Sequence, residues 1–201
     1  LGVLVDVSLK VLPRPAAETT VRFERPEAEA IAATNAWAGR PLPLSATAWH
    51  DGVLHVRWSG AAAAVRAAVR AIGGEPLAVA AAAAYWADLR EHRVPSLACR
   101  GEDTAVWRVS LPPTAAPLGL EGVQTIEWGG ALRWLVSRTP ARVVRARAAA
   151  LGGHATLFRG GDRTAGAFAP LAPAVAAIHA RLKAEFDPAG LYNRGRMYPE
   201  L

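Results

Sequence analysis

The sequence predicts an α+β protein in which an antiparallel sheet built of hairpins has helices packed on one side. In several short segments apolar residues alternate with polar ones, as half-buried strands require. Two pairs of these segments are joined by tight turns, at Asp51-Gly52 and at Gly129-Gly130. Helical spacing follows each hairpin, so a hairpin-then-helix unit appears twice, near residues 44–72 and 123–151. This repeat indicates a ferredoxin-like arrangement.

The opening segment alternates strictly, with every second residue from Val3 to Val11 apolar. The pattern predicts a half-buried strand that is stopped by Pro13 and Pro15, since proline cannot donate to a sheet ladder. A second strand is expected over Thr19–Glu24. A helix of about a dozen residues then begins at Pro26 and ends at Gly39, because proline suits the first turn of a helix.

The first hairpin joins the alternating segments 44–50 and 54–58 through Asp51-Gly52, where glycine supplies a positive φ at low cost. The apolar stripe of residues 61–72 predicts a helix that ends at Gly73-Gly74. Another helix is expected over residues 78–93, with Tyr85, Trp86 and Leu89 buried.

The second part of the chain repeats this order. A strand is predicted over residues 105–111, a surface loop over 112–120, and a hairpin between segments 123–128 and 131–136. We expect Thr139 to cap a helix that ends at Gly152-Gly153. A short strand over 155–158 follows, and the final helix carries its apolar residues on one face. These are Val175, Ile178, Leu182 and Phe186.

Length and composition favour one folded domain over residues 1–201. The net charge of +6 comes almost wholly from arginine, since Lys10 and Lys183 are the only lysines. The arginines are interleaved with alanine rather than with aromatic residues, which favours solvated helix faces, leaves contact with a protein or an anionic ligand open, and speaks against nucleic-acid binding. Cys99 is the only cysteine, so no internal disulfide can form, and a cytoplasmic location is expected. No apolar run approaches the ~18 residues of a membrane span.

Several common chemistries find no support. The five histidines lack the spacing that pairs metal ligands, and a single cysteine cannot build a zinc site. The chain contains no Gly-x-Ser-x-Gly elbow and no glycine-rich nucleotide loop. It therefore holds no recognisable cradle of its own for a pyrophosphate, and no residue takes a catalytic role on sequence grounds.

Three places could face a ligand. The small polar residues Ser45 and Thr47 follow a stiff Pro-x-Pro segment, which is equally consistent with a rigid connection from helix to strand. The pair Trp49-His50 lies beside the first hairpin turn and could line a pocket or form an aromatic sheet edge. Trp86 and Arg90, one helical turn apart, could instead form a stacked surface pair.

The C-terminal tail is more distinctive. Asp187-Pro188 ends the final helix, since proline restricts the residue before it, and Gly190 permits a left-handed turn. Asn193 then places an amide beside the bare backbone of Gly195, where a flat ligand can approach closely. Arg196 could pair with a phosphate or an acidic side chain. The alternative is a plain cap that docks the last helix.

The order of residues in Phe186–Arg196 resembles the C-terminal signature of FAD-linked oxidases of the vanillyl-alcohol-oxidase type, FDPxGxxNPGR. Arg194 stands where that pattern has proline. When this tail is taken together with four further segments, nearly the whole chain resembles the FAD-binding subunit of bacterial glycolate oxidases. The further segments are Val7–Pro15, Arg40–Ala46, Gly73–Glu75 and Trp86–Glu91.

This resemblance implies a larger protein whose N-terminal FAD-binding domain is absent from this chain, which would be the ferredoxin-like cap on the substrate side. FAD would be held mainly elsewhere, with Asn193 and Arg196 nearest to it. The resemblance also implies two partners, a second flavoprotein subunit and an iron–sulfur subunit, in a complex that oxidises glycolate or a related 2-hydroxy acid. The other interpretation left open is a non-catalytic interaction module or a small-ligand-binding module.

Overall fold

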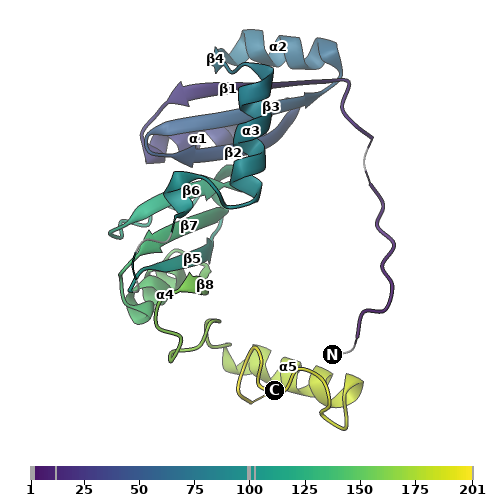
Figure 1. Cartoon of the computed structure of the whole chain (residues 1–201), viewed down its shortest axis with the longest axis vertical. Helices are drawn as coiled ribbons and strands as arrows, with labels where there is room; N and C mark the ends of the chain where they lie inside the picture. The colour runs from purple at the N-terminus through teal and green to yellow at the C-terminus, as the bar shows by residue number, and fades with distance from the viewer. Residues whose placement is uncertain (1–2, 12, 99–100, 102, 201) are drawn as a thin grey trace. The chain divides into compact units, whose positions relative to one another are not determined.

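The computed structural model describes residues 3–11, 13–98, 101 and 103–200, which fall into two compact units (Figure 1). One unit, Arg14–Asp162, is called the sheet unit here. The other combines Leu1–Pro13 with Arg163–Leu201 and is called the tail unit. No helix among the described residues is long and apolar enough to cross a membrane. The single domain expected over residues 1–201 stays a prediction.

The described part of the sheet unit contains one eight-stranded antiparallel sheet in the order β4-β1-β3-β2-β6-β7-β5-β8. The predicted α+β class is thereby confirmed, and α1, α2 and α4 pack on one side of the sheet. The strands are β1 (Ala17–Glu24), β2 (Leu44–His50), β3 (Val53–Gly60), β4 (Glu75–Pro76), β5 (Ala105–Ser110), β6 (Val123–Glu127), β7 (Leu132–Ser137) and β8 (His154–Gly160). The helices are α1 (Glu27–Ala38), α2 (Ala62–Ile72), α3 (Val79–Arg90), α4 (Ala141–Ala150) and α5 (Pro173–Phe186), with 3-10 turns η1 (Pro95–Leu97) and η2 (Trp128–Gly130).

The sheet consists of two ferredoxin-like halves joined edge to edge. The first half runs β1-α1-β2-β3-α2-β4 and has the strand order β4-β1-β3-β2 of a split βαβ fold. The second half runs β5-β6-β7-α4-β8 along the chain. Its strands lie in the order β6-β7-β5-β8, which, with β5 to β8 taken as the counterparts of β1 to β4, is the order of the first half reversed. It lacks the first helix, because residues 111–122 contain Pro112, Pro113 and Pro117. The repeat predicted from the two hairpins is thus present.

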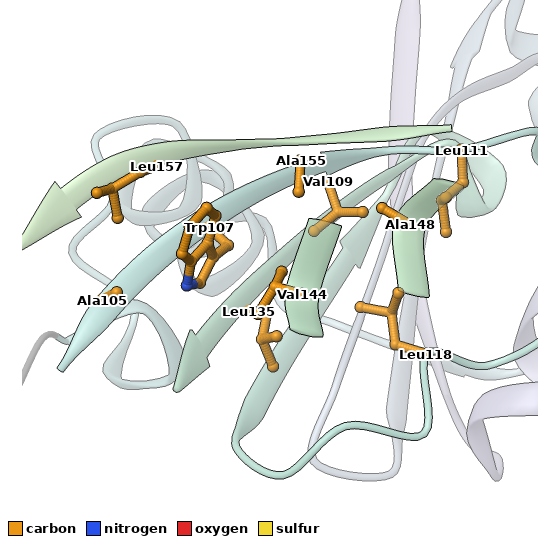
Figure 2. Close-up of a cluster of buried hydrophobic side chains, with 10 residues drawn as sticks. All are labelled: Ala105, Trp107, Val109, Leu111, Leu118, Leu135, Val144, Ala148, Ala155 and Leu157. Atoms are coloured by element: carbon orange, nitrogen blue, oxygen red, sulfur yellow. The ribbon is translucent and has the colours of Figure 1, made fainter. Parts of the chain in front are cut away.

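Alternate strand residues face opposite sides of the sheet, and each side has its own core. On one side Val56 and Trp58 of β3 pack with α1 and α2, and the corresponding cluster of the second half packs with α4. Figure 2 shows that second cluster, to which Leu118 of the loop between β5 and β6 also contributes. α3 lies on the other side, where its Leu89 packs with Trp134 of β7. Figure 1 shows α3 crossing in front of the strands of the first half.

Side chains of Asn35 and Arg133 also connect the halves. Asn35 Nδ2 on α1 donates to the carbonyl oxygens of Gly129 at 2.8 Å and Pro113 at 3.2 Å. The fully buried Arg133 donates to the carbonyl oxygens of Gly130, Ala115 and Ala116, and one of its terminal nitrogens lies 3.9 Å from Glu27. These bonds satisfy loop carbonyls that a helix would have satisfied itself.

Two predictions about local structure were wrong. Val3–Val11 is extended without being a strand, and its apolar side chains are exposed, from 56% for Val7 to 92% for Val5. Alternation supplies a suitable pattern, but a strand also needs a hydrogen-bonding neighbour, and the described sheet offers none to this segment. The helix α4 is entered through Pro140 as its N-cap, without a capping hydrogen bond from Thr139.

The final helix forms where it was predicted, yet its apolar face has no cover. None of the residues of α5 is buried, and the apolar stripe is between 42% and 63% exposed. The side chains of this stripe are Val175, Ile178, Leu182 and Phe186. Within the described chain, α5 therefore exposes an apolar face, although such a face is normally buried against another surface.

Candidate functional site

The two halves meet along a short seam. β2 and β6 pair only where Ala48–His50 lies opposite Thr125–Glu127. β2 begins earlier, at Leu44, whereas β6 gives way to η2 immediately after Glu127. The start of β2 therefore has no partner strand on that side, and a cavity of about 780 Å³ lies beside it. We call this cavity the junction groove. Its volume is in the range of small-molecule binding sites.

The most strongly positioned cation in the groove is Arg57 of β3. Its Nε donates to Ser45 Oγ at 3.1 Å and lies 3.8 Å from Glu18 Oε2. Its guanidinium lies over the indole of Trp86, 5.1 Å from the ring centroid. Trp86 is itself fixed, because its Nε1 donates to Thr20 Oγ1 at 2.9 Å. The orientation of the guanidinium is thus set on three sides.

The opposite wall of the groove comes from the end of β6. Glu127 Oε1 accepts a hydrogen bond of 2.7 Å from Trp134 Nε1. Burial raises the pKa of the Glu127 carboxyl, while that hydrogen bond and the charge of Arg108 act in the opposite direction. Next to it, Trp128 has a φ of +52° and a side chain that is 66% exposed. A positive φ is unusual for a bulky residue and costs conformational energy.

The groove brings together some of the sequence-predicted residues and adds others. Ser45, Thr47, Trp86 and Arg90 all line it. The guanidinium stacked on Trp86 is that of Arg57, whereas Arg90 is bonded to Glu91.

Sequence reasoning missed Arg57, Glu127 and Trp128. The alternation of β3 placed Arg57 on the side opposite Val56 and Trp58, which was a usable signal. Glu127 and Trp128 lie at the groove only because β2 pairs with β6, a relationship between distant parts of the chain.

The other end of the seam holds a second cavity, of about 690 Å³, lined by Trp49, His50 and Gln124 among others. Trp49 and His50 therefore line a pocket, which is one of the two roles that the sequence suggested for them, the other being an aromatic sheet edge. Behind it, the rings of His50, His55 and Tyr85 stack, with His55 and Tyr85 centroids 4.0 Å apart. Burial lowers the pKa of His55 to about 4 and raises that of Tyr85. The stack is therefore uncharged at neutral pH.

The tail turn is organised by Asp187. Its carboxylate oxygens accept the backbone N–H groups of Leu191 at 2.8 Å and Tyr192 at 2.9 Å, and Lys183 Nζ also bonds to it. The hydrogen bond from Lys183 lowers the pKa of Asp187 to about 2. Arg194 donates to the carbonyl oxygens of Gly190 and Ala189. Sequence reasoning assigned the end of the helix to Asp187-Pro188 and the turn to Gly190, and it missed the hydrogen bonds of this carboxylate.

Asn193 and Arg196 follow this turn and have exposed side chains. Asn193 has a φ of +51°, and its carbonyl oxygen accepts the backbone N–H of Arg196 at 3.2 Å. Within the described residues their side chains make no hydrogen bond, so an amide and a guanidinium are available to a ligand. This donor set fits contact with one edge or phosphate of a flavin, and it does not form an enclosing cradle. The described chain also has no cluster of three or more ligating side chains able to hold a metal ion.

The fold and the groove define the class of this chain: a duplicated ferredoxin-like α+β domain with a cavity at the seam, followed by a tail turn built on Asp187. Over its whole length the chain is 42% identical to glycolate oxidase subunit GlcE of Escherichia coli (strain K12). It spans 55% of the length of that protein. The resemblance noted from the sequence is thereby confirmed. No family model and no solved structure matches the chain.

Proposed function

We propose that this chain is the C-terminal portion of the FAD-binding subunit of a glycolate oxidase. The observation that carries this proposal is the 42% identity over all 201 residues to a glycolate oxidase subunit. In the proposed complex, glycolate or a related 2-hydroxy acid is oxidised to the 2-oxo acid. A second flavoprotein subunit and an iron–sulfur subunit are the proposed partners, and the cytoplasm, which the lone Cys99 favours, is the proposed location.

The two units have different roles in this proposal. The sheet unit, with its own cores and two cavities, is the cap on the substrate side. The tail unit packs against the FAD-binding part of the same subunit. Its exposed apolar residues support this role, since both the stripe of α5 and the Val3–Val11 segment lack a covering surface in the described chain.

The bound flavin would accept two electrons from the α-carbon of the acid. The residues of this chain closest to it would be Asn193, whose amide can bond to a ring or ribityl oxygen, and Arg196, whose guanidinium can pair with a phosphate. Asp187 would keep both in place, because its carboxylate holds the turn that precedes them. FAD would be bound mainly by residues outside this chain, and this chain alone would then be inactive.

The test uses the full-length subunit in its complex, with Asn193→Ala and Arg196→Ala made singly and together. We expect the flavin content of the purified subunit and the glycolate-dependent reduction of an acceptor dye both to fall. Arg181→Ala, on the exposed surface of α5, is the matched control and should change neither. Unchanged flavin content and activity in the double variant would remove Asn193 and Arg196 from the cofactor site.

A second measurement addresses the role of the chain as a whole. Purified alone, the 201-residue chain should show no flavin absorption in its visible spectrum, whereas the full-length subunit should be yellow. A yellow isolated chain would contradict the proposal that the flavin is held mainly elsewhere. A colourless full-length subunit in an active complex would favour the alternative of a non-catalytic module.

A further inference from the structure

Arg57 is the described groove residue best prepared to take an anion. Its Nε is already bonded to Ser45, and its plane is set by the indole of Trp86. In the described chain no hydrogen bond reaches its two terminal nitrogens, and its side chain is 30% exposed, toward the cavity that it lines. A guanidinium that is held at its Nε and over its face, but open at its forked end, can bind a carboxylate through two parallel hydrogen bonds.

The cavity also has apolar walls. Trp86 closes it on the side of α3, and Trp128 stands at its rim with a side chain that is 66% exposed. Trp128 keeps this position at the cost of a left-handed backbone, with a φ of +52°. Backbone strain of this kind is found at ligand sites, where the strained residue is held for what it contacts. The indole of Trp128 lies against the guanidinium of Arg108, 5.8 Å from the ring centroid, and lines the same cavity as Arg57. Two indoles and an open guanidinium in one cavity indicate a ligand with an apolar part and a negative charge.

The charges that line the groove limit the charge of that ligand. Two guanidinium groups, from Arg57 and Arg90, are opposed by the carboxylates of Glu18 and Glu127. Glu18 lies only 3.8 Å from Arg57. These four charges cancel, so the glutamates repel a dianion such as phosphate about twice as strongly as a monoanion, and a single negative charge at the fork of Arg57 is the charge that the groove accepts more readily.

We propose that the junction groove binds an organic monocarboxylate, with the carboxylate on the terminal nitrogens of Arg57 and the apolar part between Trp86 and Trp128. The site itself rests on the geometry of the sheet unit. Only the statement that its natural ligand is a 2-hydroxy acid rests on the proposed function. The volume of about 780 Å³ exceeds what glycolate fills, so an acid with a larger apolar group should bind more tightly.

The direct test is calorimetric titration of the 201-residue chain with mandelate, glycolate and inorganic phosphate as probes. Mandelate should bind about tenfold more tightly than glycolate, because its ring is buried between the indoles. Phosphate should bind more weakly than either acid. Phosphate binding as tight as that of mandelate would overturn the proposal, and so would the absence of mandelate binding by a chain with a folded circular dichroism spectrum.

Two variants separate the site from the fold. Arg57→Lys keeps the charge but loses the fork, and should weaken mandelate binding by about tenfold, while Arg66→Met on the exposed face of α2 should leave it unchanged. Trp128→Gly removes the strained backbone, so the chain should melt no lower than the wild type, yet mandelate should bind more weakly. Equal affinity in wild type, Arg57→Lys and Trp128→Gly would exclude this groove as the site.

The outcome is separable from that of the proposed function. If the full complex does not oxidise glycolate but the chain binds mandelate through Arg57, the proposed function fails and the groove stands as a carboxylate site. If glycolate is oxidised with unchanged KM in the Arg57→Lys complex and the isolated chain binds no mandelate, the proposed function stands and the groove is overturned.

Discussion

Asn35 and Gly129 are 94 residues apart in sequence, yet the side-chain amide of Asn35 donates a hydrogen bond of 2.8 Å to the carbonyl oxygen of Gly129. The same nitrogen also donates to the carbonyl oxygen of Pro113 at 3.2 Å. This one side chain therefore fastens α1 of the first half to the loop and the turn of the second half. It adds to the strand pairing of Ala48–His50 with Thr125–Glu127, through which β2 and β6 join the halves.

Asn35→Ala should lower the free energy of unfolding of the chain by about 1–3 kcal/mol, since it leaves partly buried carbonyl oxygens without donors. Asn35→Asp should be worse, because a carboxylate cannot donate and would face those oxygens. Urea denaturation followed by tryptophan fluorescence measures both. Asn193→Ala, in the tail unit, is the control and should not move the transition of the sheet unit.

Arg133→Met should be among the most destabilising single changes in the sheet unit, at about 3–5 kcal/mol. The guanidinium is fully buried and serves the carbonyl oxygens of Gly130, Ala115 and Ala116, so methionine would leave three acceptors unpaired and Glu27 without its cation. The same denaturation assay applies. Arg142→Met, exposed on α4, should stay within about 0.5 kcal/mol of the wild type. Similar values for the two variants would contradict this role of Arg133.

His55 should make the sheet unit less stable in mild acid. Burial lowers its pKa in the folded state to about 4, whereas a histidine in the unfolded chain titrates near ~6.5. Between these values the unfolded state binds more protons, so stability falls as the pH falls from about 6.5 toward 4. His55→Phe keeps the stack on Tyr85 and removes the proton site.

Comparing the free energy of unfolding at pH 7 and pH 5 tests this. The wild type should lose about 1–2 kcal/mol more than His55→Phe over that interval. His154→Gln, at an exposed position, should retain the wild-type pH dependence. An equal loss in wild type and His55→Phe would show that His55 is not the group responsible.

Asp187→Asn should open the tail turn while leaving the sheet unit unchanged. Asparagine loses the charge that attracts Lys183 and accepts the N–H groups of Leu191 and Tyr192 less strongly. Hydrogen exchange of these two amides should therefore accelerate, whereas Glu185→Gln on the exposed side of α5 should not alter it.

The acid limit of the same turn follows from the low pKa of Asp187, about 2. A carboxyl with a depressed pKa stabilises the folded turn above its unfolded pKa of about 4, and this contribution is lost as the pH falls from there through about 2. Protection of Leu191 and Tyr192 should thus persist at pH 5. Loss of their protection already at pH 5 would show that the carboxylate does not hold the turn.

Local chemistry explains which elements were predictable. The turn at Asp51-Gly52 was predictable, because both residues take a positive φ that few other pairs adopt. The end of α2 at Gly73 was predictable for the same reason. β4 was not, since its two residues are too few to show a period. The Val3–Val11 pattern was misleading, because alternation describes a strand's faces and not its hydrogen-bonding neighbour.

The candidate site was less accessible to sequence reasoning than the fold. Ser45 and Trp86 could be singled out as residue types that suit a pocket. The stacking of Arg57 on Trp86 depends on where α3 crosses the sheet. Glu127 lines the same groove only because β2 pairs with β6. Both relationships join residues far apart in the chain, and no short pattern encodes them.

The order of the strands also determines where this sheet can grow. Joining the halves through β2 and β6 leaves β4 and β8 as the outer strands. β4 is only two residues long and includes Pro76, which has no N–H to offer, so it is a poor template for another strand. β8 runs from His154 to Gly160 and has one neighbour in the described sheet, β5. Strand addition or aggregation of this unit would therefore proceed from β8, and a lysine or proline placed on its free edge would suppress it.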